Sequence, residues 1–148
     1  MDPKPMQFSE LLNAAGVNAS AREGDAPVVS LTADSRQVGP GSCFVAVRGP
    51  VADGHDYIPA ALAAGASSVV CDAAYNGPLP AAVARVGDTR TVVGPLAQAR
   101  LGWPARRLTL LAVTGTNGKT TVAYLVRHIL RACGRATGMI GTIGHDVG

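Results

Sequence analysis

The feature that most constrains this chain is a glycine turn set between an apolar run and an amphipathic helix. The run is residues 108–113, Leu-Thr-Leu-Leu-Ala-Val, which is typical of a central parallel strand. The turn is residues 114–119, and Thr120 begins a helix that Gly134 ends. Apolar residues recur at helical spacing and predict one buried stripe: Val122, Leu125, Val126, Ile129 and Leu130. With residues 136–140 as a return strand, the sequence predicts a strand–helix–strand unit.

The turn has the composition of a loop that binds phosphate groups. From residue 115 to residue 121 its sequence is Gly-Thr-Asn-Gly-Lys-Thr-Thr. Glycines let successive backbone N–H groups point at an anion, and the positive end of the following helix adds a favourable field. Lys119 can reach the outer phosphates, and the hydroxyl of Thr120 is suited to hold Mg²⁺. The segment is therefore predicted to bind a nucleoside triphosphate with Mg²⁺.

One position departs from the strict pattern Gly-x-x-x-x-Gly-Lys-Ser/Thr. Counted back from Gly118, the first glycine of that pattern is replaced by Val113. The alternative interpretation is a glycine turn followed by a surface lysine. The apolar run before the turn and the amphipathic helix after it favour the phosphate loop, because they supply the context that such a loop requires.

Helix and strand patterns also alternate in the chain before residue 102. The expected elements are helices over 8–16, 57–64 and 91–100 and strands over 28–32, 43–47, 68–71 and 82–86. Gly16 and Gly65 mark helix ends, and the order helix, glycine, strand is typical of an α/β unit. We therefore predict a small α/β domain over residues 1–102 and the start of a second, incomplete α/β domain over residues 103–148.

Composition and charge exclude several classes of protein. The formal net charge of +3 comes without a long basic run, so we expect no nucleic-acid partner. No stretch is long and apolar enough to span a membrane, and residues 1–5 lack the apolar segment of a secretory signal. We therefore expect a cytoplasmic protein that is monomeric and has no membrane partner.

The cysteines do not predict a disulfide or a zinc site. There are three of them, far apart in the sequence and without a Cys-x-x-Cys pair: Cys43, Cys71 and Cys133. An odd number of widely spaced cysteines is typical of reduced thiols in a cytosolic protein. We expect these thiols to be reduced and mostly buried.

The segment from Thr114 to Thr121 resembles the ATP-binding loop of the Mur ligase family, in which Val113 is no anomaly. Folylpolyglutamate synthetase and cyanophycin synthetase carry similar loops, so the loop alone does not name a substrate. The first part of the chain is similar to the first domain of the family member that adds the third peptide residue. The residues that carry this similarity are Asp34-Ser35-Arg36, Pro40-Gly41, 44–47, Gly49, 53–58 and 64–66, with 138–144 beyond the loop.

The resemblance implies an ATP-dependent ligase of peptidoglycan precursor synthesis. Such an enzyme would add a diamino acid to UDP-N-acetylmuramoyl-L-alanyl-D-glutamate, and its cofactors would be ATP and Mg²⁺. ATP would phosphorylate the glutamate carboxylate, and the amine of the diamino acid would attack the resulting acyl phosphate. The partners are then the UDP-N-acetylmuramoyl-dipeptide and meso-diaminopimelate, lysine or ornithine, which the sequence does not distinguish.

The same resemblance implies residues for two sites. The ATP site consists of Gly115, Thr116, Asn117, Gly118, Lys119, Thr120 and Thr121. Lys119 would be catalytic because it neutralises charge on the transferred phosphoryl group, and Thr120 would lie near the magnesium ion. The UDP part of the substrate would contact Ala33, Ser35, Pro50, Val51 and Ala52. Pro50 lacks an N–H donor, so its contact would use its carbonyl or packing.

Several residues have a structural interpretation beside a functional one. Asp34 and Arg36 would form a surface ion pair at the end of a strand. His55 suits an acid–base group, but we favour a turn histidine with local hydrogen bonds. Trp103 is expected to pack at the domain junction and not to stack on a base.

Two other functions are open from the sequence. The sister ligase that adds D-alanyl-D-alanine has a related first domain. A non-catalytic UDP-sugar-binding module would use the same first domain with an unproductive phosphate loop. The 46 residues from Trp103 to Gly148 are too few to cover both faces of a parallel sheet. We therefore expect a truncated central domain and no turnover by this chain alone in an assay for ADP release.

Overall fold

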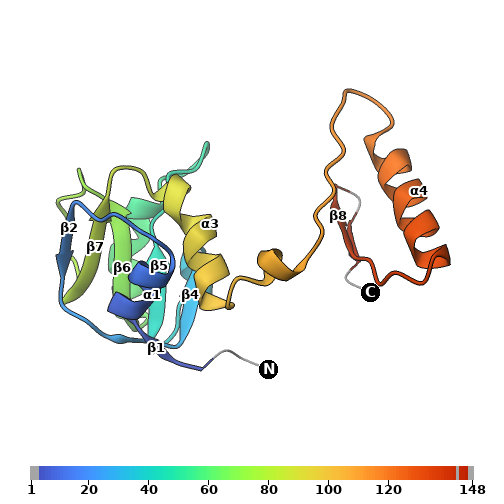
Figure 1. Cartoon of the computed structure of the whole chain (residues 1–148). Helices are drawn as coiled ribbons and strands as arrows, with labels where there is room; N and C mark the ends of the chain where they lie inside the picture. Colours follow the sequence, from blue (N-terminus) through green and yellow to red (C-terminus); the bar gives the residue numbers. More distant parts are fainter. Residues whose placement is uncertain (1–3, 143, 147–148) are drawn as a thin grey trace. The chain divides into compact units, whose positions relative to one another are not determined.

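The computed structural model describes residues 4–142 and 144–146 (Figure 1). Ile143, which belongs to the segment 138–144, lies outside the described residues. The chain forms two compact units, one up to Leu108 and one from Thr109 onward. Among the described residues, no helix is long and apolar enough to cross a membrane.

A five-stranded sheet with the order β2–β7–β6–β5–β4 forms the centre of the first unit. Its strands are β2 (Ala21–Glu23), β4 (Ser30–Thr32), β5 (Ser42–Val45), β6 (Ala66–Asp72) and β7 (Ala82–Val86). β4, β5, β6 and β7 are parallel to their neighbours, whereas β2 pairs antiparallel with β7. β1 (Met6–Gln7) and β3 (Pro27–Val28) form a separate antiparallel pair. The four parallel strands therefore end at one edge of the sheet.

Helices cover both faces of this sheet (Figure 1). α1 (Phe8–Ala14) and α3 (Thr89–Arg100) contribute to the core on one face, and α2 (Ile58–Ala63) contributes to the core on the other. Residues of β5 alternate between these cores: Val45 joins the first and Phe44 joins the second. Because both faces are covered, the central strand β5 is buried at all four of its positions, as in other parallel α/β sheets. The fold class is therefore α/β, as predicted.

Most of the elements expected before residue 102 are confirmed. Gly16 and Gly65 end their helices with φ angles of 65° and 99°, a conformation that favours glycine. The strand expected over 28–32 is divided into β3 and β4, because Val29 donates its N–H group to a turn carbonyl instead of to a neighbouring strand. The sequence does not predict β2, because its three residues are all exposed and show no apolar alternation.

The three cysteines follow the sequence prediction in most respects. All three cysteines are free, and two of them, Cys43 and Cys71, are buried while Cys133 is exposed. Burial raises the pKa of the Cys43 thiol to about 12, so this thiol stays protonated and unreactive.

Trp103 packs against the first core, as predicted, and the Arg106 guanidinium lies 4.2 Å from the centre of its ring.

The second unit consists of one helix and one antiparallel strand pair. α4 (Lys119–Ala132) matches the predicted helix, and Gly134 follows it with a φ of 74°. β8 (Met139–Gly141) pairs with β9 (Gly144–Asp146), and Arg127 of α4 forms an ion pair with Asp146.

The strand predicted over residues 108–113 does not form. These residues run as irregular chain, and no strand pairing involves them in the described part of the structure. Their apolar pattern predicts burial, but a strand also needs a neighbour to accept its backbone hydrogen bonds. The expected return strand is shorter than predicted and pairs with β9 instead.

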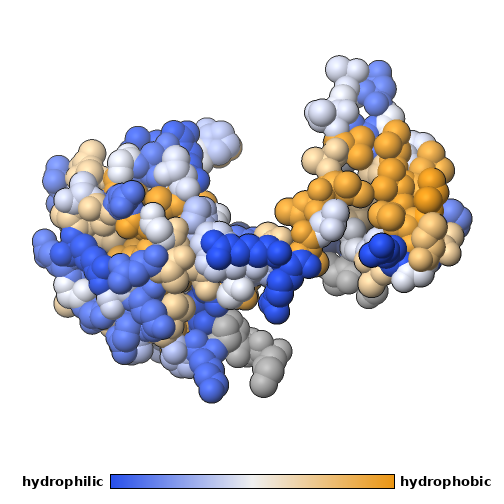
Figure 2. Space-filling model, in the orientation of Figure 1, coloured by the Kyte–Doolittle hydropathy of each residue, from blue (hydrophilic) through white to orange (hydrophobic). Residues whose placement is uncertain are grey.

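The apolar stripe of α4 is exposed. Figure 2 shows hydrophobic surface on the second unit, where Leu110, Ile129 and Ile140 are 73%, 59% and 81% exposed. No residue of α4 is buried. The stripe therefore has the composition of a helix face that packs on a sheet, and no sheet covers it within the described residues of the second unit.

Candidate functional site

The residues predicted to bind the UDP part of the substrate follow two neighbouring strands. Ala33 and Ser35 come after β4, and residues 50–52 come after β5. β4 and β5 are parallel, with Thr32 opposite Phe44. Because parallel strands end at the same edge, the topology brings both groups to one edge of the sheet, where ligands commonly bind in α/β folds.

Asp34 shapes the turn that carries Ser35. Its carboxylate caps the short helix Ser35–Gln37 by accepting the Arg36 N–H group at 3.0 Å, and it accepts two bonds from the Arg36 guanidinium, at 2.9 Å and 2.8 Å. The predicted ion pair is thus present. These bonds from Arg36 lower the pKa of Asp34 to about 2. The hydroxyl of Ser35 has no partner within the described residues, so it is available to a ligand.

A tight hairpin over residues 47–54 carries residues 50–52. Gly54 donates its N–H group to the carbonyl of Val47 at 2.9 Å, which joins the two sides of the hairpin. A second backbone bond of 2.9 Å, donated by Gly49, closes the tip. The tip is exposed, so the backbone of residues 50–52 is open to a ligand.

Arg48 and Asp53 face each other across this hairpin as a β-bridge. Arg48 Nε donates to Asp53 Oδ2 at 2.8 Å, and Asp53 Oδ1 accepts the His55 N–H at 3.0 Å and bonds the ring Nδ1 at 2.6 Å. The His55 N–H, the Arg48 guanidinium and the His55 ring hold the pKa of Asp53 well below its usual range. The bonds to Asp53 confirm the predicted local hydrogen bonding of His55, but its Nε2 also accepts a bond from Asp72, which is distant in the sequence.

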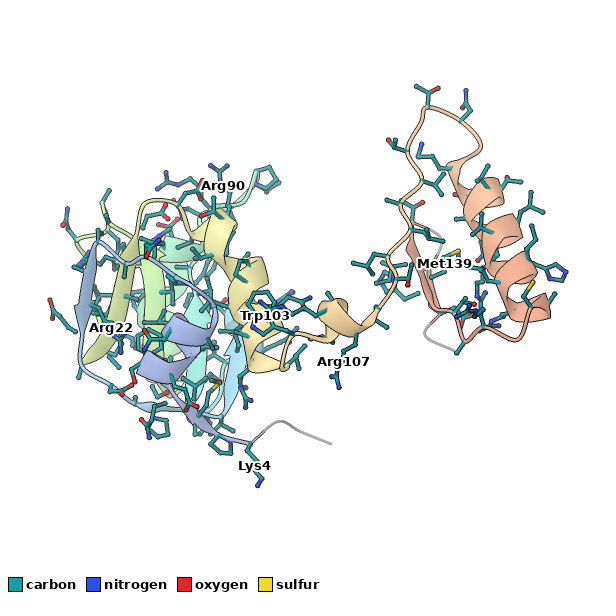
Figure 3. The ribbon with its side chains drawn as sticks, in the orientation of Figure 1. Lys4, Arg22, Arg90, Trp103, Arg107 and Met139 are labelled. Atoms are coloured by element: carbon teal, nitrogen blue, oxygen red, sulfur yellow. The ribbon has the colours of Figure 1, made fainter. Side chains whose placement is uncertain are left out.

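The arrangement of Asp34 and Arg36 recurs at the start of α3, where Figure 3 labels Arg90. Asp88 caps α3 by accepting the Arg90 N–H at 2.9 Å, and the Arg90 guanidinium also bonds this carboxylate. Arg90 thereby lowers the pKa of Asp88 to about 2. The helix predicted over 91–100 therefore begins two residues earlier, and its cap was not predicted, although an Asp before a helical pattern is a known start signal.

The lowered pKa values predict loss of stability in acid. A carboxylate whose pKa is lower in the folded state stabilises the protein above its unfolded pKa, and this contribution disappears as the pH falls through the folded pKa. For Asp34 and Asp88 the window runs from their ordinary value of 3.8 down to about 2. We expect the melting temperature, followed by circular dichroism, to fall as the pH is lowered from 4 to 2.

The variant Asp88→Asn serves as the control for this pH effect. Asparagine also caps helices, so the variant keeps the cap and removes one of the titrating groups. We expect a shallower loss of melting temperature between pH 4 and pH 2. A melting temperature that stays constant or rises over this interval in the unchanged chain would contradict the prediction.

Asp72, the last residue of β6, belongs to the same edge and was not identified from the sequence. Its Oδ1 accepts the Thr89 N–H at 2.9 Å, and its own N–H donates to His55 Nε2 at 2.9 Å. Arg48, Asp53, His55, Asp72 and Tyr75 line a hollow of about 300 Å³ here. No local pattern marks Asp72, because its partners are distant in the sequence.

The glycine turn of the second unit leads directly into α4. Gly118 is the N-cap of α4 with a φ of 75°, and Gly115 has a φ of 144°, so both positions favour glycine. The first N–H groups of a helix have no acceptor within the helix. In α4 these are the backbone N–H groups of Lys119, Thr120 and Thr121. Lys119 Nζ donates to the carbonyls of Gly115 and Thr116, so the ammonium group lies over the turn.

The donors for a metal ion are few. Within residues 4–142 and 144–146, no group of three or more His, Cys, Asp or Glu side chains could hold a metal ion. Thr120, in the first turn of α4, carries the hydroxyl that the phosphate-loop pattern assigns to Mg²⁺. A divalent ion at this place would therefore depend largely on the oxygens of a bound polyphosphate, which is usual for Mg²⁺.

Two family models match the chain. The model described as "Mur ligase family, catalytic domain" matches residues 27–100, and the "Mur ligase middle domain" matches residues 113–148. The first match contains the sheet edge with Ser35 and residues 50–52. The second contains the glycine turn and α4.

Curated relatives cover nearly the whole chain. A UDP-N-acetylmuramoyl-L-alanyl-D-glutamate–2,6-diaminopimelate ligase of Chlorobaculum tepidum is 47% identical over 152 residues, which cover 95% of this chain and 30% of the relative. A UDP-N-acetylmuramyl-tripeptide synthetase of Roseiflexus sp. is 41% identical over 144 residues, with 97% and 28% covered. The chain thus spans about 30% of the length of the curated relatives it matches.

Solved structures share the fold. The structure of a UDP-N-acetylmuramoyl-L-alanyl-D-glutamate–2,6-diaminopimelate ligase superposes with a TM-score of 0.70 at 25% identity, covering 93% of this chain and 28% of that one. The MurF ligase of Thermotoga maritima in complex with ADP superposes with a TM-score of 0.54 at 30% identity, covering 70% and 23%. The α/β arrangement of this chain is therefore also found in experimentally solved structures of ligases.

Proposed function

The chain belongs to the Mur ligase family, and we propose that it supplies the UDP-binding domain and the phosphate loop of a ligase that adds a diamino acid to UDP-N-acetylmuramoyl-L-alanyl-D-glutamate. The name of the relative at 47% identity, a 2,6-diaminopimelate ligase, supports this substrate, and the middle-domain match supports the use of ATP. The observation that carries the proposal is the turn before α4, where Gly115 and Gly118 have positive φ and the Lys119 ammonium lies over the backbone, in a chain that also has the sheet edge of the first domain. The division into a UDP-binding domain over 1–102 and an ATP-binding domain over 103–148 is part of this proposal.

In this proposal the UDP part of the substrate binds at the carboxyl edge of the sheet. The free hydroxyl of Ser35 would donate to the uridine diphosphate, beside Ala33. The exposed backbone of Val51 and Ala52 would offer N–H groups, whereas Pro50 offers only its carbonyl and its ring. Backbone donors suit a diphosphate because they approach it closely without a charged side chain.

The turn at the start of α4 fits the phosphates of ATP. Gly115 and Gly118 adopt conformations that open the backbone, and the first N–H groups of α4 face outward from the helix. Lys119 already lies over the turn, where an anion would replace the two carbonyls as its partner. Thr120 would place its hydroxyl on Mg²⁺, which neutralises phosphate charge when it is bound.

Transfer of the γ-phosphoryl group to the glutamate carboxylate needs charge neutralisation and alignment more than covalent help from the protein. Lys119 would supply the positive charge, and the N–H groups of Asn117, Gly118 and Thr121 would fix the phosphates. The amine of the diamino acid would then attack the acyl phosphate and release inorganic phosphate. The residues of this chain would bind and orient ATP and the UDP part of the substrate, and we propose that the chain alone gives no turnover.

The sister ligase that adds D-alanyl-D-alanine is a second candidate. Structures of that ligase resemble the chain, and the Thermotoga maritima protein is 30% identical to it. Competition for binding with UDP-linked dipeptide and UDP-linked tripeptide separates the two candidates. The first candidate requires the dipeptide to bind more tightly, and tighter binding of the tripeptide would favour the sister ligase.

A non-catalytic UDP-sugar-binding module is the third candidate. It would use the same sheet edge of the first unit for the UDP sugar, with a phosphate loop that does not lead to turnover. Calorimetry with UDP and with MgATP distinguishes it from the ligase. Binding of both ligands supports the ligase, whereas binding of UDP without MgATP would favour the module.

The variant Ser35→Ala tests the substrate site. We expect the affinity for UDP, measured by calorimetry, to fall about tenfold, because a hydrogen bond to a charged group is lost. The melting temperature should not change, since the hydroxyl has no protein partner within the described residues. Ser20→Ala, outside the proposed site, should bind UDP as the unchanged chain does. Equal affinities in the two variants, or no UDP binding by the unchanged chain, would contradict the proposed site.

A further inference from the structure

His55 is a buried polar side chain that joins two parts of the sheet edge. It is only 5% exposed. Its Nδ1 lies 2.6 Å from Asp53 Oδ1, and its Nε2 lies 2.9 Å from the backbone nitrogen of Asp72. Asp53 belongs to the hairpin that carries residues 50–52, and Asp72 is the last residue of β6. The ring therefore bridges the hairpin and the sheet.

The two partners fix the state of the imidazole ring. The N–H group of Asp72 is a donor, so Nε2 must act as an acceptor and carries no proton. The ring proton is therefore on Nδ1, where it is donated to the carboxylate of Asp53. This is a neutral histidine with each nitrogen used once, which leaves no ring nitrogen to exchange a proton with a substrate.

Asp53 links the His55 ring to the hairpin through hydrogen bonds of its carboxylate. Its Oδ1 is held by the ring and by the N–H group of His55, and its Oδ2 is held by Arg48 Nε at 2.8 Å. Arg48 and Asp53 are the two residues of the β-bridge at the base of the tip. Rotation of the Asp53 carboxylate would break bonds on both sides of the hairpin, so the His55 ring limits how far the tip can tilt.

Asp72, which bonds the other nitrogen of the ring, is itself held by hydrogen bonds. Asp72 Oδ1 accepts the Thr89 N–H group at 2.9 Å, and Thr89 Oγ1 donates to the carbonyl of Ala46 at 2.8 Å. Thr89 is fully buried at the start of α3. The end of β5, the end of β6 and the start of α3 are thus joined by side-chain bonds, which gives the ring a fixed support.

We propose that His55 is a positioning residue, which holds the hairpin tip at residues 50–52 in the orientation that binds the UDP part of the substrate. This inference rests on the proposed function, because it assumes that the tip contacts UDP. The essential bond is Nδ1–H to Asp53, since it reaches the hairpin directly, whereas the bond to Asp72 only supports the ring.

Two variants separate the two bonds of His55. In His55→Asn the side-chain amide takes the place of Nδ1 and can still donate to Asp53, but the acceptor for Asp72 is lost. In His55→Gln the longer amide takes the place of Nε2 and can still accept from Asp72, but the donor to Asp53 is lost. Each variant loses one buried hydrogen bond, so both should lower the melting temperature by a similar amount.

The affinity for UDP, measured by calorimetry well below both melting temperatures, tests the proposal. We expect His55→Gln to bind UDP about tenfold more weakly and His55→Asn to stay within about threefold of the unchanged chain. Amide hydrogen exchange of Gly49 and Gly54, whose N–H groups close the hairpin, should accelerate in His55→Gln and not in His55→Asn. His128→Asn, on the exposed side of α4, is the matched control and should change neither measurement.

The outcomes distinguish this inference from the proposed function. If the unchanged chain binds UDP and both His55 variants bind it equally well, the proposed function stands and the positioning role is overturned. The role is also overturned if the two variants lose affinity in proportion to their melting temperatures, because His55 would then act only on stability. If the unchanged chain binds no UDP, the proposed function and this inference both fail.

Discussion

Replacing Lys119 by methionine is expected to weaken the binding of MgATP to this chain by roughly 100-fold, because a charge-assisted bond to phosphate is lost. Methionine keeps much of the length of the side chain and removes its charge. The change should not destabilise α4. Lys119 is the first residue of the helix, where a positive charge is unfavourable by about 0.3–1 kcal/mol. Its removal also loses the exposed bonds from its ammonium group to the carbonyls of Gly115 and Thr116, so the two effects offset each other and stability should change little.

Calorimetry with MgATP and thermal unfolding of the same samples check this prediction. Arg135→Met is the matched control, because it removes an equal charge from an exposed residue beyond the other end of α4. The control should bind MgATP as the unchanged chain does. If both variants lose affinity equally, the effect comes from net charge, and Lys119 has no special contact with the phosphates.

Replacing Gly54 by alanine is expected to open the hairpin that carries residues 50–52. A Cβ atom at this position would lie 2.6 Å from both the backbone nitrogen and the carbonyl oxygen of Val47. These atoms belong to Val47, the first residue of the hairpin, and its carbonyl oxygen accepts the hairpin bond from Gly54, so they cannot move without breaking that bond. We expect a loss of about 3 kcal/mol in the free energy of unfolding, which lowers the melting temperature by roughly 12–20 °C.

UDP binding should be lost along with this stability, since the proposed contacts of residues 50–52 depend on the hairpin. Gly87→Ala is the control: a Cβ atom there would have no neighbour within 4 Å, and its φ is not positive. Such a change should leave stability unchanged or raise it by about 0.4–1 kcal/mol. A Gly54→Ala variant that melts like the unchanged chain would show that the hairpin is less tightly closed than the structure indicates.

Patterns that report burial and chain reversal predicted most of the first unit. β7 was predicted over its full extent, because residues 82–86 are apolar except for Arg85 and are buried at the other four positions. The end of α4 was predicted because Gly134 allows the positive φ that ends a helix. The prediction of a strand over 108–113 was wrong for a related reason. Apolar character predicts that a segment is buried, but not that a neighbouring strand is present to pair with it.

The site was only partly predictable. The resemblance in sequence placed Ser35 and residues 50–52 in one binding site, and the structure brings them to one edge of the sheet. The bonds that support this edge were not predictable, because they join residues far apart in the chain. His55 and Asp72 are 17 residues apart, and so are Asp72 and Thr89. Such pairs depend on the order of the strands, which no local pattern contains.

Binding of a triphosphate by the backbone N–H groups at the start of α4 is tested most directly by NMR of these amides. In a titration of the chain with MgATP, the amides of Gly115, Gly118 and Lys119 should shift together and saturate. A titration with AMP and Mg²⁺, which offers the same base without the triphosphate, should leave these amides in place. Amides of the turn that do not move at high MgATP, in a chain that is folded and binds UDP, would contradict the claim.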